Sequence, residues 1–188
     1  MRVIAGKFRG RRLKSPSSLQ TRPTSDRLRE TLFNILAPRI EGARFLDLCA
    51  GSGAVGIEAM SRGAEHITFV DRSRKLCTLI SANLDALKAG EAETEVLCSE
   101  AAEFLRRGAK KDAEPFDIIF FDPPYATDYD NVLHYVGGKV VGLLADDGVI
   151  IVEHHKKKDL SEKIGALRRY RMVKHGDSCL SFYERTAA

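Results

Sequence analysis

A glycine-rich turn between a strand and a helix constrains the fold of this chain most strongly. Residues 43–49 predict a strand, and a predicted helix follows the turn. Within the turn, Gly51, Gly53 and Gly56 match the pattern G-x-G-x-x-G. Asp71 ends the next predicted strand, 20 residues after Gly51. This arrangement predicts a parallel α/β sheet that binds an adenosine-containing cofactor, with the acid on the ribose hydroxyls.

Strand and helix patterns alternate along most of the chain, which indicates a parallel sheet covered on both faces. We expect strands at 43–49, 66–71, 94–98, 116–121, 149–153, 168–174 and 178–185. We expect helices at 54–61, 73–88, 101–107 and 130–144, and a first helix that Thr24 or Ser25 caps and Pro38 ends. The predicted α/β fold is a seven-stranded, mostly parallel sheet in residues 21–188, preceded by a basic arm in residues 1–20.

The nature of the cofactor depends on Asp47, four residues before Gly51. A dinucleotide would bring a pyrophosphate to this turn, whereas S-adenosylmethionine brings a sulfonium and an ammonium group. A carboxylate at Asp47 repels the first and attracts the second, so the sequence favours S-adenosylmethionine. The predicted third strand ends at Ser99, Glu100 and Ala101, which are expected to pass the adenine. Candidate cofactor-binding residues are therefore Asp47, Ala50, Gly51, Ser52, Gly53, Asp71, Arg72, Ser99, Glu100 and Ala101.

A second motif, Asp122-Pro123-Pro124-Tyr125, follows the apolar run 116–121. Proline restricts the residue before it to extended geometry, and prolines present carbonyls without competing N–H donors. The Asp122 carboxylate and the Pro123 carbonyl can therefore grip the two hydrogens of a planar amino group while Tyr125 stacks on its ring. These four residues are the candidate catalytic site. A proline-rich turn that merely ends a strand remains the alternative.

Charge is divided along the chain. Residues 1–39 contain 10 Lys or Arg against 2 Asp or Glu, residues 40–153 are acidic, and residues 154–188 are basic again. This asymmetry suggests a polyanion partner that is contacted mainly by the ends. The cationic candidates for contacts with the phosphates of such a partner are Lys7, Arg9, Arg11, Arg12, Lys14 and Arg22, helped by the segment 154–158. Arg22, Arg27 and Arg29 lie just before or within the first turns of the first helix, where they are expected either to hold a ligand carboxylate or to face solvent.

Composition excludes several protein classes. No apolar run reaches the roughly 18 to 20 residues of a membrane span, and the N-terminus lacks the apolar core of a signal peptide, so we expect a cytoplasmic protein. Cys49, Cys77, Cys98 and Cys179 show no C-x-x-C pairing, which favours reduced thiols over a disulfide framework. We expect no metal, no membrane and a monomer.

Taken together, these motifs resemble the RsmD family of bacterial class I S-adenosylmethionine-dependent methyltransferases. The resemblance rests on R-V-I-A-G-x-x-R-G-R-R-L at the start, R-P-T-S-D-R-L-R-E-T-L-F-N at 22–34, D-L-C-A-G-S-G-A-V-G-I-E-A at 47–59, and F-D-P-P-Y. It implies methylation of the N2 amino group of a guanine in 16S ribosomal RNA, with the small ribosomal subunit as partner. It also implies that the loop at Asp47 holds the methionine part of the cofactor. The family more often has Phe at the position of Tyr125.

Other functions use the same residues. D-P-P-Y also fits an adenine or cytosine amino group in DNA or other RNA, or a glutamine amide in a protein. An NAD-dependent oxidoreductase would use the same glycine loop and Asp71, although the sequence offers it no proton donor. A non-catalytic RNA-binding protein is a third alternative.

Overall fold

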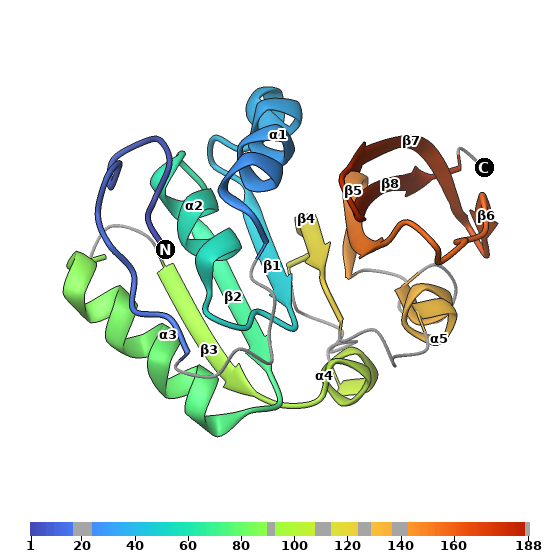
Figure 1. Ribbon diagram of the computed structural model, residues 1–188. Helices are drawn as coiled ribbons and strands as arrows, with labels where there is room; N and C mark the ends of the chain where they lie inside the picture. Colours follow the sequence, from blue (N-terminus) through green and yellow to red (C-terminus); the bar gives the residue numbers. More distant parts are fainter. Residues whose placement is uncertain (17–23, 90–92, 108–113, 124–128, 137–142, 187–188) are drawn as a thin grey trace.

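A twisted sheet forms the centre of the molecule (Figure 1). The computed structural model describes residues 1–16, 24–89, 93–107, 114–123, 129–136 and 143–186. The strands are β1 (Arg44–Leu48), β2 (His66–Asp71), β3 (Glu93–Cys98), β4 (Phe116–Phe121), β5 (Leu144–His155), β6 (Lys163–Ile164), β7 (Leu167–His175) and β8 (Ser178–Arg185). Their order is β3-β2-β1-β4-β5-β8-β7-β6. The first five in this order run parallel, and the last three are added antiparallel.

Helices cover both faces of the sheet. They are α1 (Asp26–Leu36), the 3₁₀ turn η1 (Ala37–Arg39), α2 (Ala54–Ser61), α3 (Arg74–Leu87), α4 (Ala101–Arg107) and α5 (Tyr129–His134). Side chains alternate along each strand, so the longer strands contribute to two cores. Phe45, Phe69 and Phe120 pack with α1, α2 and α3, whereas Leu48 and Phe121 pack with α4 and α5. This agrees with the predicted α/β sheet.

The predicted strand count was wrong by one, because the described residues contain eight strands. The additional strand, β6, has only two residues and pairs with β7. The fifth strand also begins earlier than expected, at Leu144 instead of residue 149. Leu144 was assigned to a helix at 130–144, but α5 ends at His134, and the apolar residue instead pairs with Phe116 of β4. Helical periodicity and a buried strand cannot be distinguished over so short an apolar segment.

Residues 1–13 form a hairpin that packs onto α2. Arg2 and Arg12 form an antiparallel bridge, and Val3, Phe8 and Leu13 are buried in the same core as α1 and α2. The buried Glu58 of α2 accepts from the backbone N–H groups of Ile4 and Ala5, at 2.8 and 3.0 Å. The hairpin is therefore attached to the sheet domain by apolar contacts and by a buried carboxylate.

Arg29 has a structural place that neither expectation anticipated. Ser25 caps α1 by accepting from Leu28 N–H, which confirms one of the two predicted caps. One turn later, Arg29 is fully buried and donates to the Arg2 carbonyl at 2.7 Å and to Asp26 at 3.0 Å. Burial lowers its pKa, while Asp26 and Glu58 oppose that shift. Arg29 thus joins the hairpin to α1 and faces neither ligand nor solvent.

Three further observations concern the described part of the chain. None of its helices is long and apolar enough to cross a membrane. All four cysteines are free thiols, Cys77 and Cys179 being buried and Cys98 exposed. No three His, Cys, Asp or Glu side chains in the same ranges gather into a possible metal site.

Candidate active site

Four acidic side chains stand in a row along one edge of the sheet. We call Asp71, Asp47, Asp122 and Glu153 the carboxylate row; they come from, or directly follow, β2, β1, β4 and β5. Each lies two residues after a strand residue of the core on the α1–α3 side, so all four project to that side. Phe121 pairs with Val152, which makes Asp122 and Glu153 the next residues in register. The strand order therefore brings together acids that lie more than 100 residues apart.

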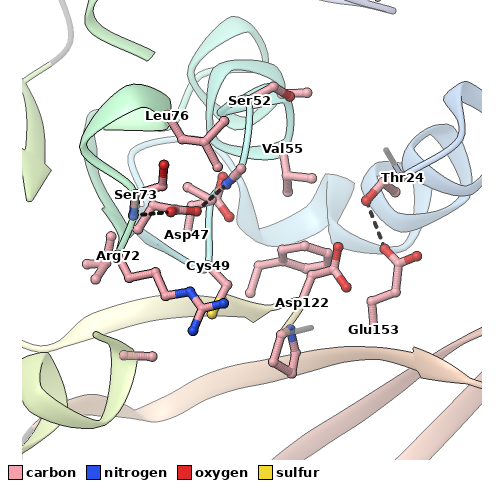
Figure 2. Close-up of a pocket in the computed structure, with 18 of the residues that line it drawn as sticks. Thr24, Asp47, Cys49, Ser52, Val55, Arg72, Ser73, Leu76, Asp122 and Glu153 are labelled. Carbon is pink, nitrogen blue, oxygen red and sulfur yellow. Dashed lines mark hydrogen bonds between the residues drawn. The ribbon is translucent and has the colours of Figure 1, made fainter. Parts of the chain in front are cut away.

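The carboxylate row lines a cavity of about 740 Å³ at the carboxyl ends of the parallel strands. Open α/β sheets bind their ligands at this edge. Figure 2 shows Arg72, Ser73 and Leu76 around one half, and Asp122 and Glu153 side by side in the other. We call these the cofactor half and the target half. All ten predicted cofactor-binding residues except Gly53 line this cavity, as do Asp122 and Pro123. Pro124, Tyr125 and Arg22 lie outside the described residues.

Close packing explains why the loop needs glycine. Gly53 has φ +76°, a left-handed conformation, and a Cβ there would lie 3.0 Å from Ile80 of α3. At Gly56 a Cβ would lie 2.3 Å from the ring of Phe69. Gly53 therefore shapes the turn, and Gly56 lets α2 approach β2 closely.

Asp71 is held by backbone donors in the cofactor half. Its two carboxylate oxygens accept from Gly51 N–H at 2.9 Å and from Ser73 N–H at 2.8 Å. These bonds fix the carboxylate between the glycine loop and the start of α3. Next to it, Arg72 and Glu100 lie 3.7 Å apart at the exposed rim. The Glu100 side chain is thus directed toward Arg72.

Asp47 is the most deeply buried acid of the cofactor half, with 2% of its surface exposed. Burial raises its pKa to about 7; the Gly56 N–H, 2.9 Å away, opposes the shift, and the charge of Asp71 adds to it. The thiol of Cys49, on the same loop, lies in the same buried and negatively charged environment. Burial, followed by Asp71 and Asp122, raises its pKa to about 12. The cavity therefore favours ligands that carry positive charge.

Asp122 and Glu153 form the target half. Burial raises the pKa of Asp122 well above its ordinary value, and Glu153 is the next largest cause. Glu153 is itself 8% exposed and accepts from the Thr24 hydroxyl at 2.8 Å (Figure 2). Sequence reasoning missed Glu153. It directly follows the apolar run 149–152, as Asp122 follows the run 116–121, but this local pattern does not show that the two strands are neighbours.

The segment 154–158 contributes less to the surface than predicted. His154 is buried and lies 2.9 Å from Ser181, and burial lowers its pKa. The prediction that His154 binds phosphate is therefore wrong. Lys156 pairs with Asp177 at 2.8 Å, whereas Lys157 and Lys158 are exposed.

Comparisons with known proteins agree with this geometry. The family described as "Conserved hypothetical protein 95" matches residues 1–184. Ribosomal RNA small subunit methyltransferase D of Escherichia coli strain K12 is 39% identical over 188 residues, which is 100% of this chain and 91% of that protein. This chain belongs to the RsmD family. The resemblance inferred from its motifs is confirmed.

Solved structures place the RsmD-family chain in a known fold. The Escherichia coli protein yhhF superimposes with a TM-score of 0.85 at 35% identity and covers 100% of this chain and 99% of its own. The S-adenosylmethionine-dependent methyltransferase of Agrobacterium tumefaciens is 18% identical, with a TM-score of 0.65 over 87% of this chain and 63% of its own. At that identity the likeness extends to the fold alone. The predicted class I methyltransferase fold is confirmed.

The cofactor half of this RsmD-family chain fits S-adenosylmethionine better than a dinucleotide. Asp47 is a buried carboxylate with one backbone donor among the bonds described, Gly56 N–H, and an ammonium group beside it would offset the cost of burying its charge. A pyrophosphate in the same cavity would meet the negative charges of the carboxylate row. The chemistry of the acids therefore selects a cationic cofactor.

Proposed function

We propose that this chain is an S-adenosylmethionine-dependent methyltransferase that modifies the N2 amino group of a guanine in 16S ribosomal RNA. The observation that carries the proposal is that Asp122 and Pro123 line the same cavity as the glycine loop and Asp71. A clamp for an amino group thus lies next to a cofactor site. The relative named Ribosomal RNA small subunit methyltransferase D supports the ribosomal substrate. Such a substrate implies a cytoplasmic location.

In this proposal the cofactor half holds S-adenosylmethionine, which supplies an electrophilic methyl group. Asp47 and the loop residues Ala50, Gly51 and Ser52 bind the methionine part. Asp71, fixed by its two backbone donors, accepts from the ribose hydroxyls. Residues 99–101 line the cavity beyond Asp71 and would contact the adenine of the bound cofactor.

The target half holds and orients the amino group. The nitrogen of an aromatic amine is a poor nucleophile, because its lone pair is delocalised into the ring. Asp122 and the Pro123 carbonyl accept its two hydrogens and thereby favour a pyramidal nitrogen. The base must leave its stack to reach them, at a cost of a few kcal/mol. In this proposal Tyr125 lies against the flipped base.

Asp122 also accepts the proton that the amino nitrogen loses on methylation. Burial and the neighbouring charge of Glu153 raise its pKa, so its carboxylate is a stronger base than an exposed aspartate. The proton then resides on an Asp122 oxygen at the edge of the cavity.

The direct test is transfer of labelled methyl groups from S-adenosylmethionine to unmethylated small ribosomal subunits, free 16S ribosomal RNA and duplex DNA in parallel. Nucleoside analysis of the product is expected to give N2-methylguanosine from ribosomal RNA. Methylated adenine or cytosine would overturn the proposed target, and a shift in thermal stability with NAD but none with S-adenosylmethionine would overturn the proposed cofactor.

The basic hairpin is our proposed second contact with RNA. Lys7, Arg9, Arg11, Arg12 and Lys14 are all exposed, while the apolar residues between them are buried. Arg11 also donates to the Ala86 carbonyl of α3 at 2.9 Å, which fixes its direction. Within the predicted arm, residues 1–14 are thus attached to the rest of the chain and present cations to phosphates.

Neutralising charges tests this arm better than deleting it, because deletion would also remove Val3, Phe8 and Leu13 from the core. We expect Arg9→Gln with Arg12→Gln to reduce the slope of log affinity against log salt by about 0.7–0.9 for each phosphate that the arm no longer neutralises. The matched control changes the exposed Arg106 and Lys163 to Gln. Equal slopes for both double variants and the wild type would contradict a role for the arm.

A further inference from the structure

Glu153 lies in the target half without a role in the proposed clamp. It follows Val152 of β5 just as Asp122 follows Phe121 of β4, and these two strand residues are paired. The Glu153 side chain is 8% exposed and its carboxylate lies near enough to raise the pKa of Asp122. Two neighbouring buried carboxylates repel each other when both are ionised, so a ligand with several hydrogen-bond donors stabilises the ionised pair.

The Watson–Crick edges of the bases differ in the donors that they offer. Guanine presents N1–H beside the two hydrogens of its N2 amino group, so three donors lie along one side. Adenine and cytosine present one amino group next to a ring nitrogen that is an acceptor. Ionised carboxylates only accept hydrogen bonds. Of these three bases, guanine alone gives two adjacent carboxylates a donor each without placing a lone pair against one of them.

We propose that Glu153 selects guanine by accepting its N1–H while Asp122 and the Pro123 carbonyl hold the N2 amino group. This inference rests on the proposed function and adds a specificity residue to it. A carboxylate has about four lone-pair sites, so the bond from Thr24 to Oε2 is compatible with a second donor from the base. Thr24 lies directly before the cap of α1 and therefore fixes the direction of the Glu153 side chain.

A purely structural role for Glu153 is the alternative. In that case the bond to Thr24 would only attach the start of α1 to β5. The two roles predict different base preferences. A structural anchor affects every RNA substrate alike, whereas a residue that reads N1–H distinguishes guanine from an analogue without this hydrogen.

The test compares guanine with 2-aminopurine at the target position of the RNA fragment that the wild type methylates. 2-Aminopurine keeps the amino group at C2, but its N1 is an acceptor. We expect the wild type to prefer guanine by about 100-fold or more in kcat/KM. In Glu153→Gln the amide oxygen accepts from Thr24 and the amide NH2 turns to the base, so the preference is expected to fall by at least about tenfold. Glu65→Gln, the same change at an exposed acid at the opposite end of the sheet, is the matched control and is expected to retain the preference for guanine.

Comparing the two ratios removes any intrinsic difference in reactivity between the bases. An unchanged ratio in Glu153→Gln, with guanine still methylated by the wild type, would overturn the inference and leave the proposed function intact. Absence of guanine methylation by the wild type would overturn both. If Glu153→Gln transfers methyl to neither RNA, the same ratio is measured from the affinities of the two RNAs, and an equal loss for both again overturns the inference.

Discussion

The two halves of the cavity contain the same chemical groups in opposite surroundings. In the cofactor half, Asp71 accepts from the backbone N–H groups of Gly51 and Ser73, and Asp47 accepts from that of Gly56. All of these residues lie in the segment 47–73, which contains the glycine loop and the strand that follows it. In the target half, Asp122 and Glu153 face each other, and the donor described for Glu153 is a hydroxyl from a segment 129 residues away. The first half is fixed before any ligand binds. The second contains mutual repulsion that a donor-rich ligand relieves.

This difference suggests that one half binds the cofactor and the other selects the target. Backbone donors hold a carboxylate without adding charge, which suits a group that must bind the same cofactor in every turnover. Two neighbouring carboxylates raise the free energy of the ligand-free site when both are ionised. The site therefore selects ligands whose hydrogen-bond donors reduce this repulsion. Variants in each half should therefore change different measurements.

The largest effect is expected in the target half. Asp122→Ala removes the proposed acceptor of the amino group and of its proton, and we expect kcat to fall by at least about 10³-fold. Affinity for S-adenosylmethionine, measured by calorimetry, should change less than about threefold, because Asp122 does not hold the cofactor. The control is Asp117→Ala, at the other end of the same strand. It also removes an acid, one that accepts from the Arg44 N–H, and it is expected to change kcat much less. An equal loss of cofactor affinity in Asp122→Ala would remove the distinction between the halves.

The second effect is expected in the cofactor half. Asp71→Ala removes the proposed acceptor of the ribose hydroxyls and leaves Gly51 N–H and Ser73 N–H without their partner. We expect the Kd for S-adenosylmethionine to rise about 100-fold, consistent with the loss of charged hydrogen bonds. Asp85→Ala, an exposed acid on α3, is the control. Unchanged cofactor affinity in Asp71→Ala, with reduced kcat, would reverse the assignment of the two halves.

The same contrast explains which parts could be predicted from sequence. Gly51 and Asp71 are 20 residues apart in the sequence, and the hydrogen bond between them follows from a local strand–turn–helix pattern. Asp122 was recognisable because prolines follow it. Glu153 was not, since its role depends on β5 lying next to β4, which is a property of strand order and not of local pattern.

Besides strand order, the burial of polar and charged side chains could not be predicted from the sequence. Arg29 and His154 occupy segments rich in exposed cations, and composition alone assigned them to the surface or to a ligand. In the structure, Arg29 is compensated by Asp26 and Glu58, and His154 contacts Ser181. Such compensation requires partners from α2 and β8, so it becomes visible only when the helices and strands have been packed.

A smaller effect concerns the stability of the cofactor half. The folded-state pKa of Asp47, about 7, lies above its unfolded value, so the folded state binds more protons and stability falls as pH rises from about 4 to 7. Asp47→Asn removes this loss. We expect its free energy of unfolding, from urea denaturation, to exceed that of the wild type by roughly 1–3 kcal/mol at pH 8 and by less at pH 5. A difference that does not change with pH would show that the charge of Asp47 is not the cause.

The smallest expected effect measures the repulsion in the target half directly. Glu153 is a negative neighbour that raises the pKa of Asp122, so Glu153→Gln should lower that pKa. Asp122 acts as an acceptor when it is ionised, and activity therefore rises with pH through its pKa. The acid limb of the kcat/KM profile should move to lower pH in Glu153→Gln. The position of this limb reflects the titration of the Asp122–Glu153 pair and not of one residue. Glu65→Gln, an exposed acid at the opposite end of the sheet, is expected to leave the limb in place. A shift to higher pH would mean that Glu153 assists ionisation of Asp122, and the two halves would then not differ in the way their charges are compensated.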